Sequence, residues 1–224
     1  QYDYLGMNGD WSFYDEEKSS TTPLSVANVF TAEGYETLND VSVSTMSLAS
    51  KVNVKVYTFP EGEKVTDPSK GTLVCSQDAS IDFSGFHKIS LNQPVKLQPG
   101  QKFSVVETIS YTQNGEKRYF LSVEKGYKQQ IYSGYEYYSW NDMAKCNAGE
   151  SYISTGNTWY DLADEAALED APVSDAAAYE LTYGMDSWDG KLTIGNARIK
   201  AYTKNRTKDP GETVAPTQTA VPEQ

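Results

Sequence analysis

The chain has 224 residues and a formal net charge of -12 at pH 7, from 19 Lys and Arg against 31 Asp and Glu. This length suits one all-β domain of ordinary size and supplies enough apolar residues for a core. The negative charge excludes nucleic acid and anionic lipid as partners, because both require clustered Lys and Arg. No apolar run approaches the roughly 20 residues that a membrane helix needs, so membrane insertion is not expected.

Short segments with alternating polar and apolar residues follow one another along the chain, with turn signals between them. They predict strands over 41–45, 52–57, 72–76, 88–91, 95–97, 103–106, 108–111 and 118–123. The sequence Gln98-Pro99-Gly100-Gln101 predicts a type II turn, since proline fixes the first central position and glycine accepts a positive φ at the second. Asn114-Gly115 is the dipeptide favoured in type I′ hairpins.

This spacing of strands, with no helices between them, predicts an all-β fold: an antiparallel, jelly-roll-like β-sandwich with long loop insertions. The Ala-, Asp- and Glu-rich stretch 163–168 allows one short helix before Pro172. We expect the sandwich to occupy residues 1–204. Residues 205–224 are rich in Pro and Thr and predict an extended linker to neighbouring modules or a cell-surface anchor, and hence an extracellular or surface-attached protein.

The residues that most often perform catalysis are sparse, and no enzyme activity is predicted. The single histidine, His87, lies among apolar strand residues, where packing is a commoner role than catalysis. The two cysteines, Cys75 and Cys146, have no metal-ligand spacing. Asn141, Asp142, Asp186 and Asp189 offer oxygen ligands for a calcium site, which stays an open alternative, but they lack EF-hand spacing, and neither a metal nor a cofactor is predicted. A glycosidase needs only two carboxylates and stays open as a third hypothesis.

Several blocks of sequence occur in an order that resembles a known family. They include 26–32, 85–91, 97–106, 149–152, 158–162 and 196–203. Together they are similar to the lectin-like β-sandwich domain found beside papain-like cysteine peptidases on bacterial cell surfaces. The resemblance spans about residues 24 to 203. It implies a jelly-roll-like sandwich and glycan binding, and it supplies no catalytic residues.

Two stretches look unusually long and aromatic for that family, 125–145 and 163–190. Rings among Gly, Ser, Lys and Gln are typical of a surface that covers an apolar ligand face and still bonds to hydroxyls. The predicted ligand-binding residues are Trp140, Trp188, Tyr137, Tyr138, Tyr135, Trp11, Asn141 and Asp189. Trp159 and Tyr202 fall inside family-like blocks and are expected to be core residues.

These features predict a non-catalytic carbohydrate-binding module for a polysaccharide, with an α-glucan such as starch as the favoured ligand. A pyranose has C–H groups on its face and hydroxyls on its rim, so it matches an aromatic ring flanked by Asn or Asp. The alternative is a protein-interaction or peptidase-accessory module that uses the same rings as interface hot spots.

Overall fold

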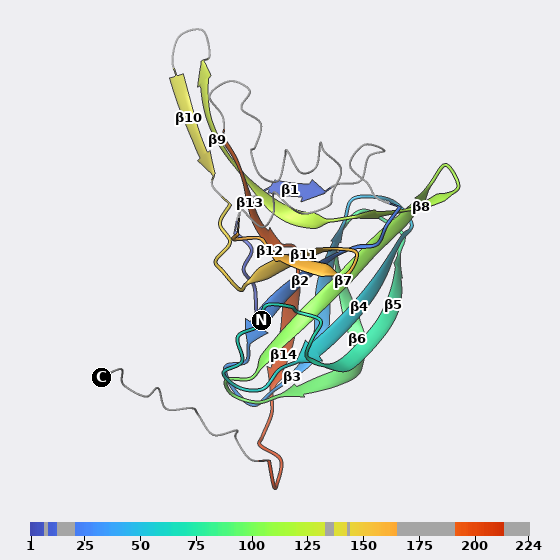
Figure 1. Cartoon of the computed structure of the whole chain (residues 1–224), viewed down its shortest axis with the longest axis vertical. Helices are drawn as coiled ribbons and strands as arrows, with labels where there is room; N and C mark the ends of the chain where they lie inside the picture. The colour runs from blue at the N-terminus through green and yellow to red at the C-terminus, as the bar shows by residue number, and fades with distance from the viewer. Residues whose placement is uncertain (7–8, 13–20, 133–136, 143, 165–190, 213–224) are drawn as a thin grey trace.

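The computed structural model describes residues 1–6, 9–12, 21–132, 137–142, 144–164 and 191–212, with the backbone path only for 9–12, 125–132, 137–142 and 191–194. The described residues form strands and connecting loops (Figure 1). The strands are β1 (Gly9–Ser12), β2 (Leu24–Thr31), β3 (Glu36–Thr45), β4 (Ser50–Thr58), β5 (Thr72–Ile81), β6 (Gly85–Leu97), β7 (Lys102–Gln113), β8 (Glu116–Phe120), β9 (Ser122–Tyr132), β10 (Tyr137–Asp142), β11 (Ser151–Thr155), β12 (Thr158–Asp161), β13 (Lys191–Ala197) and β14 (Lys200–Asn205).

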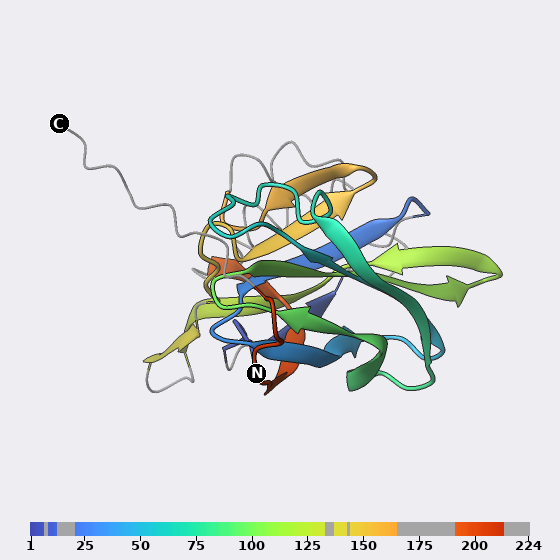
Figure 2. The same ribbon diagram turned by 90° about the horizontal axis from the view of Figure 1, so that it is seen from below.

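The strands pair antiparallel in three sheets, which confirms the predicted all-β sandwich. The large sheet has the order β12-β11-β2-β7-β4-β5, with β8 also paired to β7. A small sheet of β14, β3 and β6 covers its inner face (Figure 2). A third sheet is built on β9, which pairs with β13 along one edge and with β1 and β10 along the other.

The core lies between the large and small sheets, and strand alternation fills it. In β4, Val52, Val54 and Val56 are at most 1% exposed and face inward, while Lys51 and Asn53 lie on the outer face. Burying each such valine contributes about 1.5–3 kcal/mol. Aromatic side chains complete this core, with the ring centroids of Phe30 and Phe103 5.5 Å apart.

A second, smaller apolar cluster lies on the opposite face of the large sheet. The loop 59–71, between β4 and β5, covers one half of this outer face. Phe59 and Val65 from the loop pack with Ala27, Val29, Val106 and Tyr152 from the sheet. The other half of the outer face has polar side chains and no such cover among the described residues.

A buried polar network fixes the third sheet against the sandwich. Asn28 of β2 is fully buried, and its Nδ2 donates to the carbonyls of Ala197 and Ile199 at 3.0 and 3.1 Å. Ser151 Oγ contacts the side-chain oxygens of Asn28 and Asn196. These buried contacts hold the end of β13 against β2 and β11, and β9 pairs with β13.

Both predicted turns are confirmed. Asn114 and Gly115 have φ values of 51° and 82°, as a type I′ turn requires, and they join β7 to β8. Gly100 has a φ of 76°, and Gln101 N–H donates to the carbonyl of Gln98 at 3.1 Å. This second turn crosses from one layer to the other, because β6 pairs with β3 whereas β7 pairs with β2 and β4.

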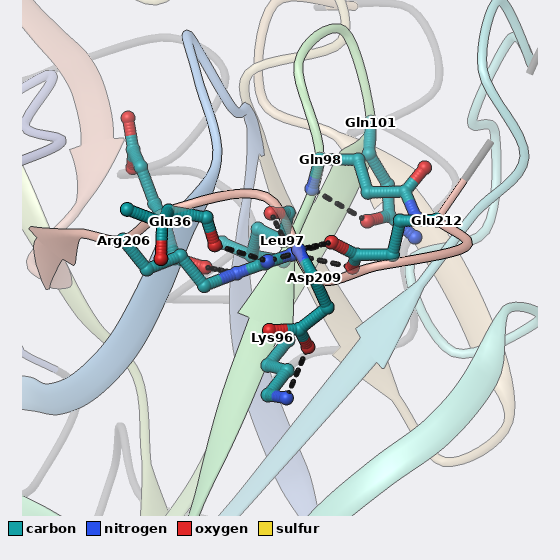
Figure 3. Close-up of polar contacts among 9 residues, drawn as sticks. Glu36, Lys96, Leu97, Gln98, Gln101, Arg206, Asp209 and Glu212 are labelled. Carbon is teal, nitrogen blue, oxygen red and sulfur yellow. Dashed lines mark hydrogen bonds and ion pairs between the residues drawn. The ribbon is translucent and has the colours of Figure 1, made fainter. Parts of the chain in front are cut away.

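The chain after β14 folds back onto the sandwich through residues 206–212, which we call the C-terminal clasp (Figure 3). The guanidinium of Arg206 donates to the carbonyls of Glu36 and Leu97 at 3.2 and 3.0 Å, and it pairs with both carboxylate oxygens of Glu212 at 2.7 Å. Glu212 also accepts the N–H of Asp209 at 2.8 Å. The first eight residues of the predicted linker therefore belong to β14 or to the clasp, and 213–224 lie outside the described residues.

The short helix predicted over 163–168 falls almost wholly outside the described residues. In the part of the chain that the structure describes, no helix is long and apolar enough to cross a bilayer.

Candidate functional site

The strands of the β9–β10 hairpin contain three of the six predicted aromatic binding residues. Its register places Tyr137 opposite Tyr132, Tyr138 opposite Ile131 and Trp140 opposite Gln129. Because successive residues of a strand alternate between faces, Tyr138 and Trp140 share one face of the hairpin while Tyr137 and Asn141 share the other. A ligand lying on one face therefore meets one of these two pairs.

Trp11 lies on the same edge of β9 as β10 does. β1 pairs with 122–125 and β10 with 127–132, so the two strands follow one another along β9. Trp11 is opposite Val123, and Trp140 is opposite Gln129 six residues further on, an even spacing that places both tryptophans on one face. Val123 is fully buried, so β1, which contains Trp11, pairs with the sandwich end of β9. β10, which contains Trp140, pairs with the part of β9 that lies further out (Figure 1).

Three predicted binding residues, Tyr135, Trp188 and Asp189, lie outside the described residues. For Tyr137, Tyr138, Trp140, Asn141 and Trp11 the structure gives the strand positions above. The aromatic site stays a prediction.

A polar groove of about 520 Å³ lies on the uncovered half of the large sheet's outer face. Hydrogen-bonded pairs line it: Asn53 Nδ2 donates to Asp78 Oδ1 at 2.8 Å, and Lys51 Nζ donates to Ser80 Oγ at 2.8 Å. Tyr119 lies at the β8 side with the ammonium of Lys117 4.9 Å from its ring centroid. These groups offer hydrogen bonds and one aromatic ring.

A second hollow, of about 450 Å³, lies between the loop 59–71 and the β11–β12 hairpin. Trp159 and Tyr160 line it together with Lys64, Asp161 and Asp164. Trp159 was expected to be a core residue, and it does pack against the second apolar cluster, but it is only half-buried and faces this hollow. The available signal is its place on β12: Trp159 is opposite Ser154, on the outer face, in a hairpin that Gly156 turns.

His87, Cys75 and Cys146 are the side chains considered above for catalysis. The ring of His87 bonds through Nε2 to the carbonyl of Phe83 at 2.9 Å, as expected for a locally packed histidine. Cys75 and Cys146 are free thiols, and burial raises the pKa of Cys146 to about 12, so it is a thiol at neutral pH. The described residues contain no group of three or more His, Cys, Asp or Glu that could hold a metal ion.

Two carboxyl groups, those of Glu107 and Glu124, are buried. Glu107 of β7 faces the core beside Val54, is 1% exposed, and has its Oε1 without a hydrogen bond. Burial raises the pKa of Glu107 well above its ordinary value. Burial also raises the pKa of Glu124, although its Oε1 accepts the N–H of Gly6 at 2.7 Å. Neither group lines the two hollows described above.

Comparison with known proteins assigns the family. The model of the lectin-like domain matches residues 1–173, more than half of the chain. The chain belongs to the lectin-like domain family. The match includes β9 and β10 and therefore the aromatic hairpin, and it ends before Trp188.

Two solved structures are similar to this lectin-like domain. One contains the cysteine protease and lectin-like domains of Cwp84, a surface-layer-associated protein of Clostridium difficile, with 23% identity over 88% of this chain and a TM-score of 0.47. The other is the clostridial cysteine protease Cwp84 after propeptide cleavage, with 25% identity over 88% of this chain and a TM-score of 0.48. The matches cover 36% and 40% of those chains, so this chain spans less than half their length. No curated protein matches the sequence.

Proposed function

We propose that this lectin-like domain is a non-catalytic carbohydrate-binding module that recognises a polysaccharide. The observation that supports this most directly is membership of the lectin-like family over residues 1–173. The β9–β10 hairpin adds a physical reason, since it extends beyond the sandwich and places Tyr138 and Trp140 on one face (Figure 1). Rings in such a position stack against the C–H face of a sugar.

The proposed binding residues are Trp140, Trp188, Tyr137, Tyr138, Tyr135, Trp11, Asn141 and Asp189. Stacking that removes about 100 Å² of apolar surface from water contributes about 2.5 kcal/mol per sugar. After the cost of ordering the ligand, two or three such contacts leave an affinity in the micromolar to millimolar range. Weak sites suit modules that act together on one repeating polymer, because linkage raises their avidity.

The finer assignments are also proposals. An α-glucan such as starch is the first ligand to try, because a curved chain meets angled rings better than a flat chain does. We place the protein outside the cell or attached to its surface, with neighbouring modules connected through the part of the predicted linker that follows the clasp, 213–224. The surface-layer association of Cwp84 and its combination of protease and lectin-like domains agree with this setting.

Affinity electrophoresis tests the function. Gels containing soluble starch, xylan, β-glucan or mucin should retard the wild-type domain in at least one case, and Trp140→Ala or Trp188→Ala should weaken the retardation severalfold. Phe83→Ala is the matched control, because Phe83 is an aromatic residue with 71% exposure on a different loop. Unretarded migration of the wild type in every gel would contradict carbohydrate binding, and equal retardation of the wild type and both tryptophan variants would contradict the assignment to Trp140 and Trp188.

The two competing functions make different predictions. A protein-interaction module would retain a neighbouring module in a pull-down that soluble glycans do not weaken, while migrating freely in the gels. A glycosidase would release reducing sugar from the polymer that retards it, and substitution of one Asp or Glu would abolish the release.

A further inference from the structure

The hollow beside Trp159 has the form of a ligand pocket. Its walls come from two separate segments: Lys64 and Thr66 from the loop 59–71, and Trp159 and Asp164 from the β11–β12 hairpin and the turn after it. Lys102 of β7 and Tyr152 of β11 also line it. A volume of about 450 Å³ lies within the roughly 300–1,000 Å³ range of small-molecule sites.

The indole of Trp159 is held in one orientation. Its Nε1–H donates to Ser69 Oγ at 3.1 Å, and Ser69 Oγ donates in turn to Asp67 Oδ1 at 2.6 Å. The same carboxylate oxygen accepts the N–H of Ser69 at 2.8 Å. Because the second apolar cluster supports the ring from below, the ring needs no reordering when a ligand arrives.

The floor and rim of the hollow are equally fixed. Tyr152 is 2% exposed, and its hydroxyl donates to the carbonyl of Val65 at 2.7 Å, which ties the loop to the sheet. Burial raises the pKa of Tyr152 to about 12, so this hydroxyl remains a donor at neutral pH. Asp161 accepts the N–H groups of Gly149 and Ala163 at 2.7 and 3.0 Å, so its two oxygens brace the rim.

The charges around the hollow balance. Lys64 and Lys102 supply two ammonium groups, and Asp161 and Asp164 supply two carboxylates. The net charge of the lining therefore favours neither an anionic nor a cationic ligand. A neutral molecule with an apolar face for the indole and hydroxyl groups for the polar rim fits this lining best, and a sugar has both features.

We propose that this hollow is a second saccharide subsite, separate from the β9–β10 hairpin, that holds one or two sugar units against Trp159. This inference rests on the proposed carbohydrate-binding function and assigns it a further site. It makes Trp159 a binding residue as well as a packing residue. It also gives the loop 59–71 a role in recognition, since Lys64 and Thr66 form one wall.

Nuclear magnetic resonance of the indole N–H groups tests the subsite without altering the fold. The chain has four tryptophans, and each signal is assigned from one variant among Trp11→Phe, Trp140→Phe, Trp159→Phe and Trp188→Phe. The wild-type domain is then titrated separately with maltoheptaose, xylohexaose and cellohexaose. We expect the Trp159 signal to shift with the sugar that binds, because a stacked sugar changes the environment of the ring.

Affinity measurements on exposed wall residues provide a second readout. Lys64→Ala should weaken binding of the same sugar about three- to tenfold, whereas Tyr119→Ala in the polar groove, which lies on the same face of the sheet, should leave it unchanged. An equal loss from both variants would mean that the whole face contacts the ligand and would overturn the assignment to the hollow.

The outcomes separate the two proposals. If a sugar shifts the Trp140 or Trp188 signal and leaves the Trp159 signal in place, the second subsite is wrong and the proposed function stands. If only the Trp159 signal shifts, the subsite is confirmed and the hairpin is not the binding surface for that sugar. If none of the three sugars shifts any indole signal and no gel retards the domain, both proposals fail.

Discussion

Two segments without strand structure cover the sandwich, the loop 59–71 and the C-terminal clasp 206–212, and different interactions hold them. The loop packs Phe59 and Val65 into an apolar cluster with residues of β2, β7 and β11. The clasp has Arg206 at its centre, which bonds to two backbone carbonyls and to Glu212 (Figure 3). The strength of apolar burial does not depend on a charge, whereas a surface ion pair weakens with electrostatic screening by salt and with protonation of its carboxylate.

The two covering segments have different consequences for binding and for the attachment of neighbouring modules. The loop 59–71 supplies one wall of the Trp159 hollow, so the apolar cluster keeps a binding surface in shape. The clasp determines where the chain leaves the sandwich, at the end opposite the β9–β10 hairpin (Figure 1). A module attached through 213–224 would therefore leave the hairpin accessible to a polymer.

Removing the apolar anchor of the loop should have the largest effect. Phe59 is 2% exposed, so Phe59→Ala is expected to lower the free energy of unfolding by about 3–5 kcal/mol and to open the Trp159 hollow. Urea unfolding measures the change. Phe83→Ala, at a residue with 71% exposure, should change stability by less than about 0.5 kcal/mol. Equal effects of the two substitutions would show that the loop does not bury Phe59 in solution.

Much of the fold could be predicted from local sequence, and the covering segments could not. The alternation of polar and apolar residues predicted strands within β3 and β4, and Asn114-Gly115 predicted the turn between β7 and β8, because each signal lies within a few residues. The loop 59–71 contains the turn-forming residues Pro60, Gly62, Pro68 and Gly71. Its partners Val29, Val106 and Tyr152 are distant in sequence, so no local pattern connects them to Phe59.

The site was less accessible to sequence reasoning for the same reason. Trp159 is both a packing residue and a lining residue, and only the spatial approach of Lys64 and Thr66 distinguishes a hollow from a core position. The clasp looked like linker because its composition is polar. The carbonyls that Arg206 reaches belong to Glu36 and Leu97, more than a hundred residues earlier in the chain.

Glu107→Gln should have the second-largest effect and should remove a pH dependence of stability that neither covering segment causes. Burial raises the pKa of Glu107 above its unfolded value of about 4.3, so wild-type stability falls as the pH rises between these two values. The variant should be more stable than the wild type at pH 8, by a gap that grows by up to about 1.4 kcal/mol per pH unit between the two pKa values. At pH 4 the gap should nearly close.

Urea unfolding at pH 4, 6 and 8 measures this gap. Glu63→Gln, at an exposed acid of the loop 59–71, is the control and should follow the wild-type curve. A Glu107→Gln protein whose stability ran parallel to the wild type at all three pH values would show that Glu107 is not buried as an uncompensated carboxyl.

Arg206→Ala should have a smaller effect, about 1–2 kcal/mol, because the lost hydrogen bonds are near the surface and water replaces part of them. Amide hydrogen exchange at Asp209 and Glu212 should accelerate strongly, since the clasp has no apolar anchor like Phe59 among its described contacts. Arg206→Lys keeps the charge and loses the planar fork, so it should restore only part of the protection. Full restoration by lysine would mean that charge alone holds the clasp.

Glu212→Gln should have the smallest effect, and its difference from the wild type should be present at neutral pH and disappear in acid. Hydrogen bonds from Arg206 lower the pKa of Glu212 to about 2, below its unfolded value of about 4.3. The clasp is therefore stabilised by this group above about pH 4.3 and loses that contribution as the pH falls towards 2. Wild-type protection of the Asp209 N–H, which Glu212 accepts, should decline across this window, while the Glu212→Gln protein should be weakly protected throughout.

The Phe59 N–H, which bonds to the carbonyl of Lys102 at 2.9 Å, should keep its protection in both proteins, because apolar packing and not a carboxylate holds that segment. Identical exchange of the Asp209 N–H in the two proteins at pH 6 would mean that the ion pair does not stabilise the clasp and that the carbonyl contacts of Arg206 alone hold it.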